Sequence, residues 1–337
     1  MGAQVYQERI AERAASALSS ESAHSWSVDR AVFRSMRSRL PGNRRLPLQA
    51  ISTASPAVRR EVGRVLFRGA SVTHRMNLEL PPAPSGDVIT IHDVVAWRFS
   101  DESPPVRAAA EEAQRAAAVI CVSEFSAHEA IELLGITDPY VVHNGVDDAF
   151  FDAAPLDDVL RRGLGIGEQY VLHAGGAARR KNLEVLAEAW PEVRRSRPGL
   201  QLVLSGPEHP RRTALFEGMP DTILLGRVPD HLVPGLIARS SVVVVPSLYE
   251  GFGLPVLEAM AANVPVVAVR TSSLPEVVGD AGLLVEPTAR GVAEGLRDAT
   301  SGDSEISQLI RAGRQRAAGF TWAAAAQGHA RVWDAVS

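Results

Sequence analysis

Short apolar runs alternate with segments of helical periodicity along most of the chain. In the second half, six runs are typical of buried parallel strands, because they are rich in β-branched residues and bounded by polar residues or glycine. They are YVLHAG, QLVLSG, TILLG, SVVVVPS, PVVAV and GLLVEP. The first half contains five more strand-like runs, namely SWSVDRAVF, SVTHRM, DVITIHD, AVICVS and YVVHN. Strands that alternate with helices predict an α/β fold with parallel sheets.

A break rich in Asp and Gly separates the two series of strands. We therefore predict a first doubly wound, Rossmann-like domain over residues 1–146, a linker over 147–167 and a second such domain over 168–320. Two such sheets that face one another would hold a ligand between the carboxyl edges of their strands. The Ala-rich segment 321–337 is predicted to be a helix.

The stretch EGFGLPVLE, residues 250–258, lies where an apolar strand gives way to a predicted helix. Its Gly-x-Gly turn allows a ligand to approach the backbone, and the first N–H groups of the helix favour a phosphate. Glu250 precedes the turn and Glu258 lies on the helix, so both can face one crevice. Because a carboxylate repels phosphate, we expect these two glutamates to bind hydroxyl groups, one of a sugar and one of a ribose.

The same stretch resembles the E-x7-E motif of retaining glycosyltransferases of family 4 (group 1), which have the GT-B fold. Two glutamates eight residues apart also occur by chance on solvated helices, so the resemblance depends on six further blocks in the family's order. These blocks are ITIHDVVAWRF, AAAVICVSEFSAHEAIELLGI, VVHNGVD, YVLHAGGAARRKNLEVLAEAW, LGRVPD and VVAVRTSSLPEVVGDAGLLVEP.

The resemblance implies that a hexose is transferred with retention from a nucleotide-diphosphate sugar to a glycan or lipid-linked acceptor. GDP-mannose is favoured over UDP-sugars, because the blocks look closest to bacterial mannosyltransferases. His92, Glu250, Arg180 and Lys181 are the implied catalytic residues. The implied donor-binding residues are Gly2, Asp93, Gly175, Gly176, Arg227, Val228, Gly251, Phe252, Gly253, Leu254 and Glu258. In enzymes of this fold the last helix usually packs back on the first domain.

Lys181 is the single lysine of a chain in which the other 34 of its 35 basic residues are arginine. It follows Arg180 in HAGGAARRKN, where an ammonium group can reach a diphosphate beside the Gly175–Gly176 turn. A solvated basic cluster is the usual explanation of such a run, but the glycines and the family spacing favour the diphosphate. The chain contains no Asp-x-Asp and no Cys/His cluster with metal-ligand spacing, so we expect neither a metal nor another cofactor.

Charge is unevenly distributed, because residues 1–75 hold 13 arginines and five acidic residues, whereas the whole chain has a net charge of −4. This basic region could contact an anionic membrane or a phosphate-bearing lipid acceptor, or its arginines could simply be solvated. Nucleic acid is not expected, since interleaved aromatic residues and known motifs are lacking. No apolar run reaches the ~20 residues of a membrane span, and no signal-peptide core precedes the first helix. We expect a cytoplasmic protein, peripheral at the inner membrane face if the arginines bind lipid.

Family members normally open with a strand and a glycine-rich loop, whereas this chain opens with MGAQVYQERIAERAASAL. Only Gly2 matches the loop, and two explanations of the absent strand are open: the real start of the protein lies upstream of Met1, or the first domain lacks its usual first strand. The second explanation supports an alternative function, a catalytically impaired GT-B subunit that acts as a binding partner. A pyridoxal phosphate phosphorylase of the same fold would need a second lysine.

Several other residues are expected to be structural. Cys121 lies in an apolar run and is expected in the core, and Asn144 is expected in an interdomain turn. His74, His143 and His173 have no motif context of their own.

Overall fold

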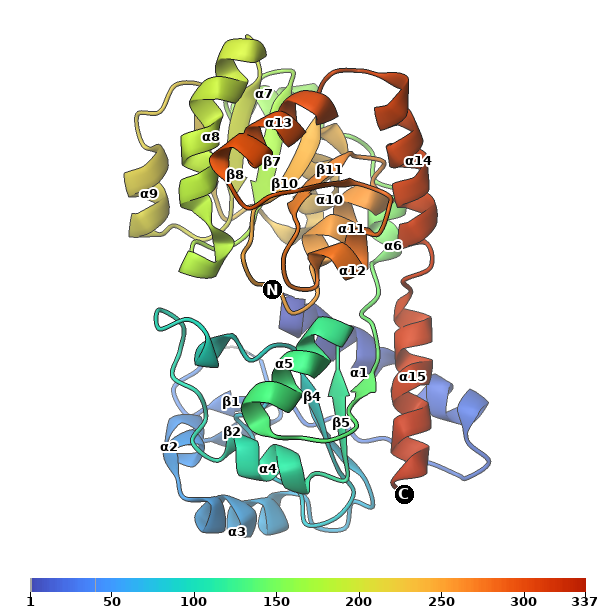
Figure 1. Ribbon diagram of the computed structural model, residues 1–337. Helices are drawn as coiled ribbons and strands as arrows, with labels where there is room; N and C mark the ends of the chain where they lie inside the picture. The colour runs from blue at the N-terminus through green and yellow to red at the C-terminus, as the bar shows by residue number, and fades with distance from the viewer. Residues whose placement is uncertain (1, 40) are drawn as a thin grey trace. The chain divides into compact units, whose positions relative to one another are not determined.

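The computed structural model describes residues 2–39 and 41–337, which form two compact units (Figure 1). The first unit runs to Gly145 and includes Trp322–Ser337, and the second comprises Val146–Thr321. The segment 147–167, expected to be a linker, carries the short helices α6 (Asp148–Phe151) and α7 (Asp158–Gly163) and belongs to the second unit. Leu156 and Ile166 of this segment are buried there.

The first unit contains a parallel sheet of four strands in the order β3-β4-β5-β6. Its strands are β3 (Thr73–Arg75), β4 (Asp87–Ile91), β5 (Ala118–Cys121) and β6 (Tyr140–Val141). A separate parallel pair is formed by β1 (Phe33–Ser35) and β2 (Arg44–Leu46). The helices are α1 (Gly2–Glu21), α2 (Leu48–Thr53), α3 (Pro56–Leu66), the 3₁₀ turn η1 (Val95–Trp97), α4 (Ala109–Arg115), α5 (Glu124–Leu134) and α15 (Trp322–Ala335).

The strand expected over SWSVDRAVF is wrong for most of its length, because β1 begins only at Phe33. The apolar side chains of this run do not line a sheet face. Val28 remains 44% exposed, whereas Trp26 donates its indole N–H to Ser22 Oγ and packs on the core of the first unit. The polar residues between them leave no continuous apolar run that a buried strand could use.

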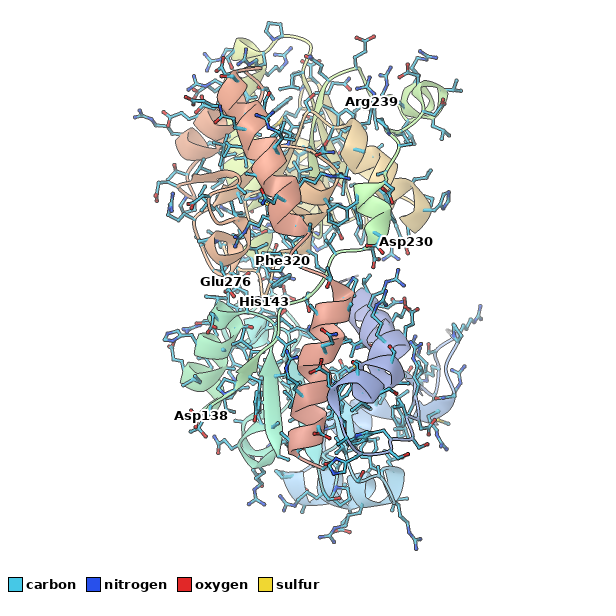
Figure 2. All side chains as sticks on the ribbon, turned by 90° about the vertical axis from the view of Figure 1, so that its right-hand side faces the viewer. Asp138, His143, Asp230, Arg239, Glu276 and Phe320 are labelled. Atoms are coloured by element: carbon cyan, nitrogen blue, oxygen red, sulfur yellow. The ribbon has the colours of Figure 1, made fainter. Side chains whose placement is uncertain are left out.

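Alternating side chains of the first sheet enter two different cores, as the period of a strand requires. Val88 and Ile120 lie in one core, which is completed by α1 and α15. The other core contains Ile89 and Cys121 and is covered by helices that include α5. Figures 1 and 2 show α15 lying along α1, so the last helix of the chain belongs to the first unit.

The second unit contains a parallel sheet of six strands in the order β12-β11-β10-β7-β8-β9. All six strands expected from the sequence are present, namely β7 (Tyr170–Ala174), β8 (Gln201–Ser205), β9 (Thr222–Gly226), β10 (Val242–Val245), β11 (Val266–Val269) and β12 (Leu283–Val285). Its remaining helical elements are η2 (Arg179–Lys181), α8 (Leu183–Ser196), α9 (Pro210–Phe216), η3 (Asp230–Leu232), α10 (Val233–Arg239), α11 (Leu254–Ala261), α12 (Leu274–Val278), α13 (Ala289–Ala299) and α14 (Ser304–Ala317).

The order of the strands places a topological switch beside β7. From β7 the chain continues to β8 and β9 on one side and then returns to β10, β11 and β12 on the other. The loops that follow β7 and β10 therefore diverge at the carboxyl ends of two neighbouring strands. A crevice forms at such a point in open parallel sheets, and ligands bind there.

No helix within residues 2–39 and 41–337 combines the length and the apolar character needed to cross a bilayer.

Candidate functional site

The three predicted charged residues Arg180, Lys181 and Glu250 meet at the switch point of the second sheet. Arg180 and Lys181 lie in η2, which follows β7, and Glu250 lies in the loop that follows β10. Lys181 Nζ is 2.5 Å from Glu250 Oε1, and Arg180 Nη1 is 3.4 Å from Oε2. Arg180 and Glu250 come together because β7 and β10 are neighbours in the sheet, although 70 residues separate them in the sequence.

Glu250 is 8% exposed, yet it is held in its ionised form. Burial acts to raise the pKa of this carboxyl group, but the charges of Lys181 and Arg180, with hydrogen bonds from Lys181 and Ser247, outweigh burial and lower the pKa below its ordinary value. At neutral pH the site thus holds one carboxylate between two cations. This arrangement leaves a net positive charge, which favours an anionic ligand.

The glycine-rich turn after Glu250 is held by serines that the sequence analysis did not single out. Ser273 Oγ donates to the carbonyl oxygens of Glu250 and Phe252, at 2.9 and 2.7 Å. Ser272 Oγ accepts from the Glu250 N–H at 3.1 Å. Gly253 has a φ of +108°, which only glycine adopts readily, and it is the N-cap of α11. The run TSS, which comes just after β11 in the block VVAVRTSSLPEVVGDAGLLVEP, is the sequence feature that could have indicated these serines.

Glu258 lies on α11, one turn into the helix that Gly253 caps. Burial, and then the negative charge of Asp147, raise its pKa from 4.5 to about 7. The two glutamates of the motif therefore have opposite electrostatic environments. Glu250 is ionised and its negative charge is balanced by two cations, whereas Glu258 ionises only near neutral pH.

The other predicted residues of the second unit follow neighbouring strands. Gly175 and Gly176 come directly after β7, and a Cβ atom on Gly176 would meet nothing within 4 Å. Arg227 is exposed and Val228 is buried, and both come directly after β9. These residues lie at the same edge of the sheet as Glu250, since all six strands are parallel.

The remaining predicted residues, Gly2, His92 and Asp93, lie in the first unit. His92 and Asp93 come directly after β4, and Gly2 opens α1 one turn before Tyr6. Asp93 Oδ1 accepts from the Val95 N–H at 3.2 Å, a bond within the loop that follows β4. His92 hydrogen-bonds to the Met76 backbone, and its Nε2 has no partner among the described residues. Burial lowers the pKa of His92 to about 4, so its imidazole is neutral.

A buried series of hydrogen bonds lies beside His92, and no sequence motif indicates it. Tyr6 packs edge-on against His92, with 4.5 Å between ring centroids. Its hydroxyl lies 2.6 Å from His329 Nε2 and 2.6 Å from Thr90 Oγ1, which in turn lies 2.8 Å from His74 Nε2.

The Ala325 carbonyl group determines which atom is the donor and which the acceptor in each of these hydrogen bonds. His329 Nδ1 lies 2.7 Å from the Ala325 carbonyl oxygen, which can only accept, so Nδ1 carries the proton. Since burial lowers the pKa of His329 to about 4, its Nε2 is unprotonated and accepts from Tyr6. Tyr6 then accepts from Thr90, and Thr90 accepts from His74. The absence of a partner for His74 Nδ1 within the described residues agrees with this assignment.

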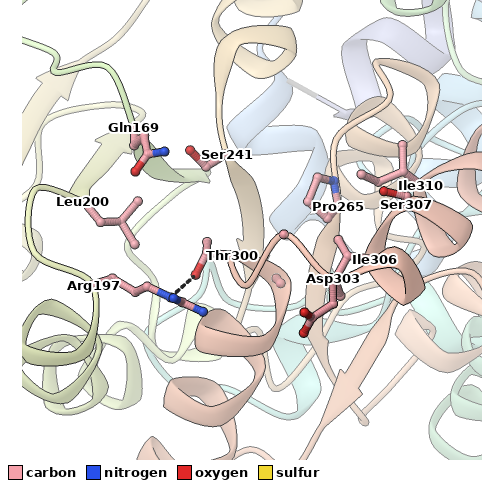
Figure 3. A pocket seen from close by; sticks show the side chains of 12 residues that line it. Gln169, Arg197, Leu200, Ser241, Pro265, Thr300, Asp303, Ile306, Ser307 and Ile310 are labelled. Atoms are coloured by element: carbon pink, nitrogen blue, oxygen red, sulfur yellow. Dashed lines mark hydrogen bonds between the residues drawn. The ribbon is translucent and has the colours of Figure 1, made fainter.

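A pocket of about 260 Å³ lies at the opposite, amino edge of the second sheet (Figure 3). It is lined by the residues that come directly before β7, β10 and β11, namely Gln169, Ser241 and Pro265. Arg197 also lines the pocket, but its guanidinium donates to Thr300 Oγ1 and to the Arg297 carbonyl oxygen. The pocket is separate from the carboxyl edge that carries the predicted residues.

Comparison with known proteins identifies the family and the fold of the chain. The family described as "Glycosyl transferases group 1" matches residues 168–301. The O-antigen chain mannosyltransferase B of Escherichia coli is 30% identical over 278 residues, which cover 74% of this chain and 71% of that protein. A GDP-mannose-dependent alpha-(1-6)-phosphatidylinositol dimannoside mannosyltransferase of Mycobacterium tuberculosis is 30% identical over 243 residues, which cover 68% of this chain and 62% of that protein. The solved structure of WaaG, a glycosyltransferase involved in lipopolysaccharide biosynthesis, has a TM-score of 0.65 and 19% identity, and covers 82% of this chain and 80% of WaaG.

Proposed function

Since the chain belongs to the group 1 glycosyltransferases and has a GT-B fold, we propose that it transfers a hexose, with retention, from a nucleotide-diphosphate sugar to a hydroxyl group of a glycan or lipid-linked acceptor. The observation that carries this proposal is the meeting of Arg180 and Lys181 with Glu250 at the switch point. Two cations and one carboxylate suit a ligand that joins a diphosphate to a sugar.

In the proposed reaction, the bond between the anomeric carbon and the donor phosphate oxygen breaks while the acceptor oxygen bonds to the same face of the sugar. The acceptor proton passes to the departing phosphate. Arg180, Lys181 and the first N–H groups of α11 stabilise the negative charge on the diphosphate. Glu250 binds donor hydroxyl groups and stabilises positive charge at the ring, and Glu258 binds the ribose. Backbone groups around Arg227 and Val228 contact the base.

Mannose is the favoured sugar and GDP-mannose the favoured donor, with UDP-sugars as the alternative. The support comes from the names of the two relatives, since both are mannosyltransferases and one is GDP-mannose-dependent. We assign the cationic role to Arg180 and Lys181 and expect no divalent ion in the reaction. A single cation about 4 Å from a charge contributes about 4 kcal/mol before desolvation at an effective dielectric constant of about 20.

A second candidate function is a catalytically impaired subunit that binds a partner enzyme or a nucleotide sugar. The pairing of Arg180 and Lys181 with Glu250 favours the enzyme.

The proposed function also includes contact with an anionic membrane through the arginines of the first unit. Arg30, Arg37 and Arg44 are exposed, and Met36, which lies among them, is 64% exposed. A basic surface with an exposed apolar side chain is suited to lipid headgroups.

The decisive experiment is a screen of nucleotide sugars for transfer and slow hydrolysis by mass spectrometry, with and without EDTA. We expect turnover of one donor in EDTA, and a loss on the order of 100-fold in Lys181→Ala, which removes a contact that strengthens as the phosphate leaves. Arg179→Ala, a change of an exposed neighbour in η2, is the control and should retain turnover. Restoration of a lost activity by manganese or magnesium would overturn the metal-free reaction, and wild-type turnover in Lys181→Ala would overturn the diphosphate assignment.

A further inference from the structure

Arg212, on α9, is a buried arginine that no carboxylate neutralises. Its exposure is 3%, and within residues 2–39 and 41–337 no ion pair joins it to an acidic side chain, whereas its neighbour Arg211 pairs with Glu184. Its guanidinium donates to the Pro207 carbonyl oxygen at 2.9 Å and to the Gly175 carbonyl oxygen, and its Nε has no partner in the part of the chain that the structure describes. Burial alone accounts for the lowering of its pKa.

The other arginines that are buried to this degree differ in this respect. Arg59 pairs with Glu112, Arg75 with Asp87, and Arg161 with Asp158. Burying a charge without a counter-charge costs several kcal/mol. Arg212 lacks such a counter-charge among the described residues. Its positive charge can therefore attract an anion that is not part of the protein.

The contacts of Arg212 place it directly behind the glycine turn that follows β7. The Gly175 N–H donates to the Ser205 carbonyl oxygen at 2.9 Å, while the Gly175 carbonyl oxygen accepts from Arg212. Gly206 lies so close that a Cβ atom there would be 2.0 Å from the Gly175 oxygen. Both polar groups of Gly175 are thus used inside the protein, which fixes the backbone that leads to Gly176.

Arg212 lies at the same edge of the sheet as the charges of the candidate site. His173, near the end of β7, is close to Arg212, Lys181 and Glu250. Its pKa is lowered to about 3 first by burial and then by Arg212 and Lys181, while Glu250 acts in the opposite direction. Arg180, Lys181 and Arg212 together exceed Glu250 by two positive charges. A diphosphate esterified at both ends carries one negative charge on each phosphate and would balance this excess.

We propose that Arg212 is a positioning residue for the donor diphosphate, which it attracts from behind the Gly175–Gly176 turn while it fixes that turn through the Gly175 carbonyl group. This inference rests on the proposed function, and it adds a third cation to the two that the motif indicated. The side chain does not touch the ligand. It acts through its charge and through the backbone that it holds.

The test compares Arg212→Met with Arg161→Met by calorimetric titration. Arg161 is the matched control, since it is also buried in the second unit and also holds a backbone carbonyl group, that of Ile166, but lies before β7. The probes are GDP, UDP, guanosine and uridine. The charge of Arg212 acts on the ligand through space and not by a direct hydrogen bond. At the effective dielectric constant of about 20 that holds near a protein surface, Arg212→Met should therefore lose about 10-fold in affinity for the nucleoside diphosphate, with unchanged affinity for the nucleoside and a weaker dependence on salt. Arg161→Met should keep the wild-type ratio of the two affinities.

Unchanged diphosphate affinity in a folded Arg212→Met protein would overturn the inference, and so would equal losses for nucleoside and nucleoside diphosphate. If Arg212→Met does not fold, Arg212→Lys keeps the charge and removes one donor of the fork, and should retain most of the diphosphate affinity and its salt dependence. If Arg212→Lys instead lowers the affinity for the nucleoside diphosphate, relative to that for the nucleoside, as far as an uncharged side chain is expected to, the charge has no role. Wild-type protein that binds neither GDP nor UDP would instead reject the proposed function itself.

Discussion

Glu250 is the residue whose surroundings most restrict its role. Its carboxylate is the shared partner of Lys181 and Arg180. In Glu250→Gln, both cations lose this partner, so we expect affinity for the nucleoside diphosphate to be equal to or higher than that of the wild type. Transfer should fall, because a neutral amide stabilises the positive charge at the sugar ring less well. Titration with nucleoside diphosphate and measurement of donor hydrolysis check both effects, and a loss of diphosphate affinity would contradict this division of roles.

Glu258 should give nucleotide binding a pH dependence of its own. Its pKa is raised to about 7 by burial and by Asp147, and only the ionised carboxylate accepts from two ribose hydroxyl groups with both oxygens. Affinity for the nucleoside diphosphate should therefore rise with pH through about 7. Glu258→Gln should lose this component, while the titration of the phosphate, common to both proteins, remains. Parallel pH profiles of the two proteins would reject ribose binding by Glu258.

The raised pKa of Glu258 also affects the stability of the protein. Between its ordinary value of 4.5 and about 7, the folded state binds more protons at this residue than the unfolded state does. The contribution of Glu258 to the free energy of unfolding is therefore largest below pH 4.5 and is lost as the pH rises through about 7.

Sequence motifs indicate the residues of the site that have a local pattern, but not those whose role depends on packing between distant parts of the chain. Lys181 and Glu250 are conspicuous because each lies beside glycines at the end of an apolar run. Arg212 looks like one of many arginines, since its lack of a counter-charge depends on packing. Tyr6 and His329 are 323 residues apart and meet only after α1 and α15 have packed on one sheet.

At the scale of elements, the buried arginine network of the first unit is a specific source of stability. Arg59, on α3, has no exposed surface and donates to both oxygens of Glu112 on α4, at 2.5 and 3.0 Å. It also donates to four backbone carbonyl groups, those of Ile51, Leu78, Glu79 and Leu80. One side chain thus joins α2, α3, α4 and the loop before β4.

Arg59→Met should lower the free energy of unfolding by about 3–5 kcal/mol, because it leaves Glu112 partly unpaired in the interior. Arg60→Met is the matched control, since Arg60 pairs with Glu111 at 2.8 Å but both side chains are about 40% exposed. Such exposed pairs contribute about 0–1 kcal/mol. Urea unfolding of both variants measures the difference, and similar losses would show that the network does not act as inferred.

Every strand of the second sheet was predicted from the sequence. The inner strands β11, β10, β7 and β8 are buried, because a parallel strand between two layers of helices must be an unbroken apolar run. The edge strands β9 and β12 are only partly buried, but they too are short apolar runs. The strand expected over residues 25–33 failed, since β1 lies in a separate two-stranded pair and needs no such run. The segment 147–167, expected to be a linker, belongs to the second unit, and its contacts there are long-range, such as the bond from the Leu156 N–H to the Gly235 carbonyl oxygen. A local pattern does not indicate such contacts.

At the scale of the whole molecule, the uneven distribution of charge has a structural counterpart. The parallel pairing of β1 and β2 places Arg34 opposite Arg45 and Phe33 opposite Arg44. Like charges that face each other across two strands are destabilising, and an anionic surface nearby would relieve this repulsion. Each arginine close to a bilayer that contains anionic lipids contributes about 1 kcal/mol of attraction.

We therefore expect the wild-type protein to sediment with vesicles of phosphatidylglycerol and phosphatidylcholine, and not with vesicles of phosphatidylcholine alone. Binding should disappear at about 1 M salt, where the Debye length falls to about 3 Å. The triple variant Arg30→Glu, Arg37→Glu, Arg44→Glu should lose binding, because it reverses three exposed charges of the basic surface. The triple variant Arg162→Glu, Arg195→Glu, Arg290→Glu makes the same change of net charge at exposed positions of the second unit, and should still bind. Equal losses in the two variants would mean that net charge alone governs the attraction, and retention of binding by the first variant would mean that the membrane contact lies elsewhere.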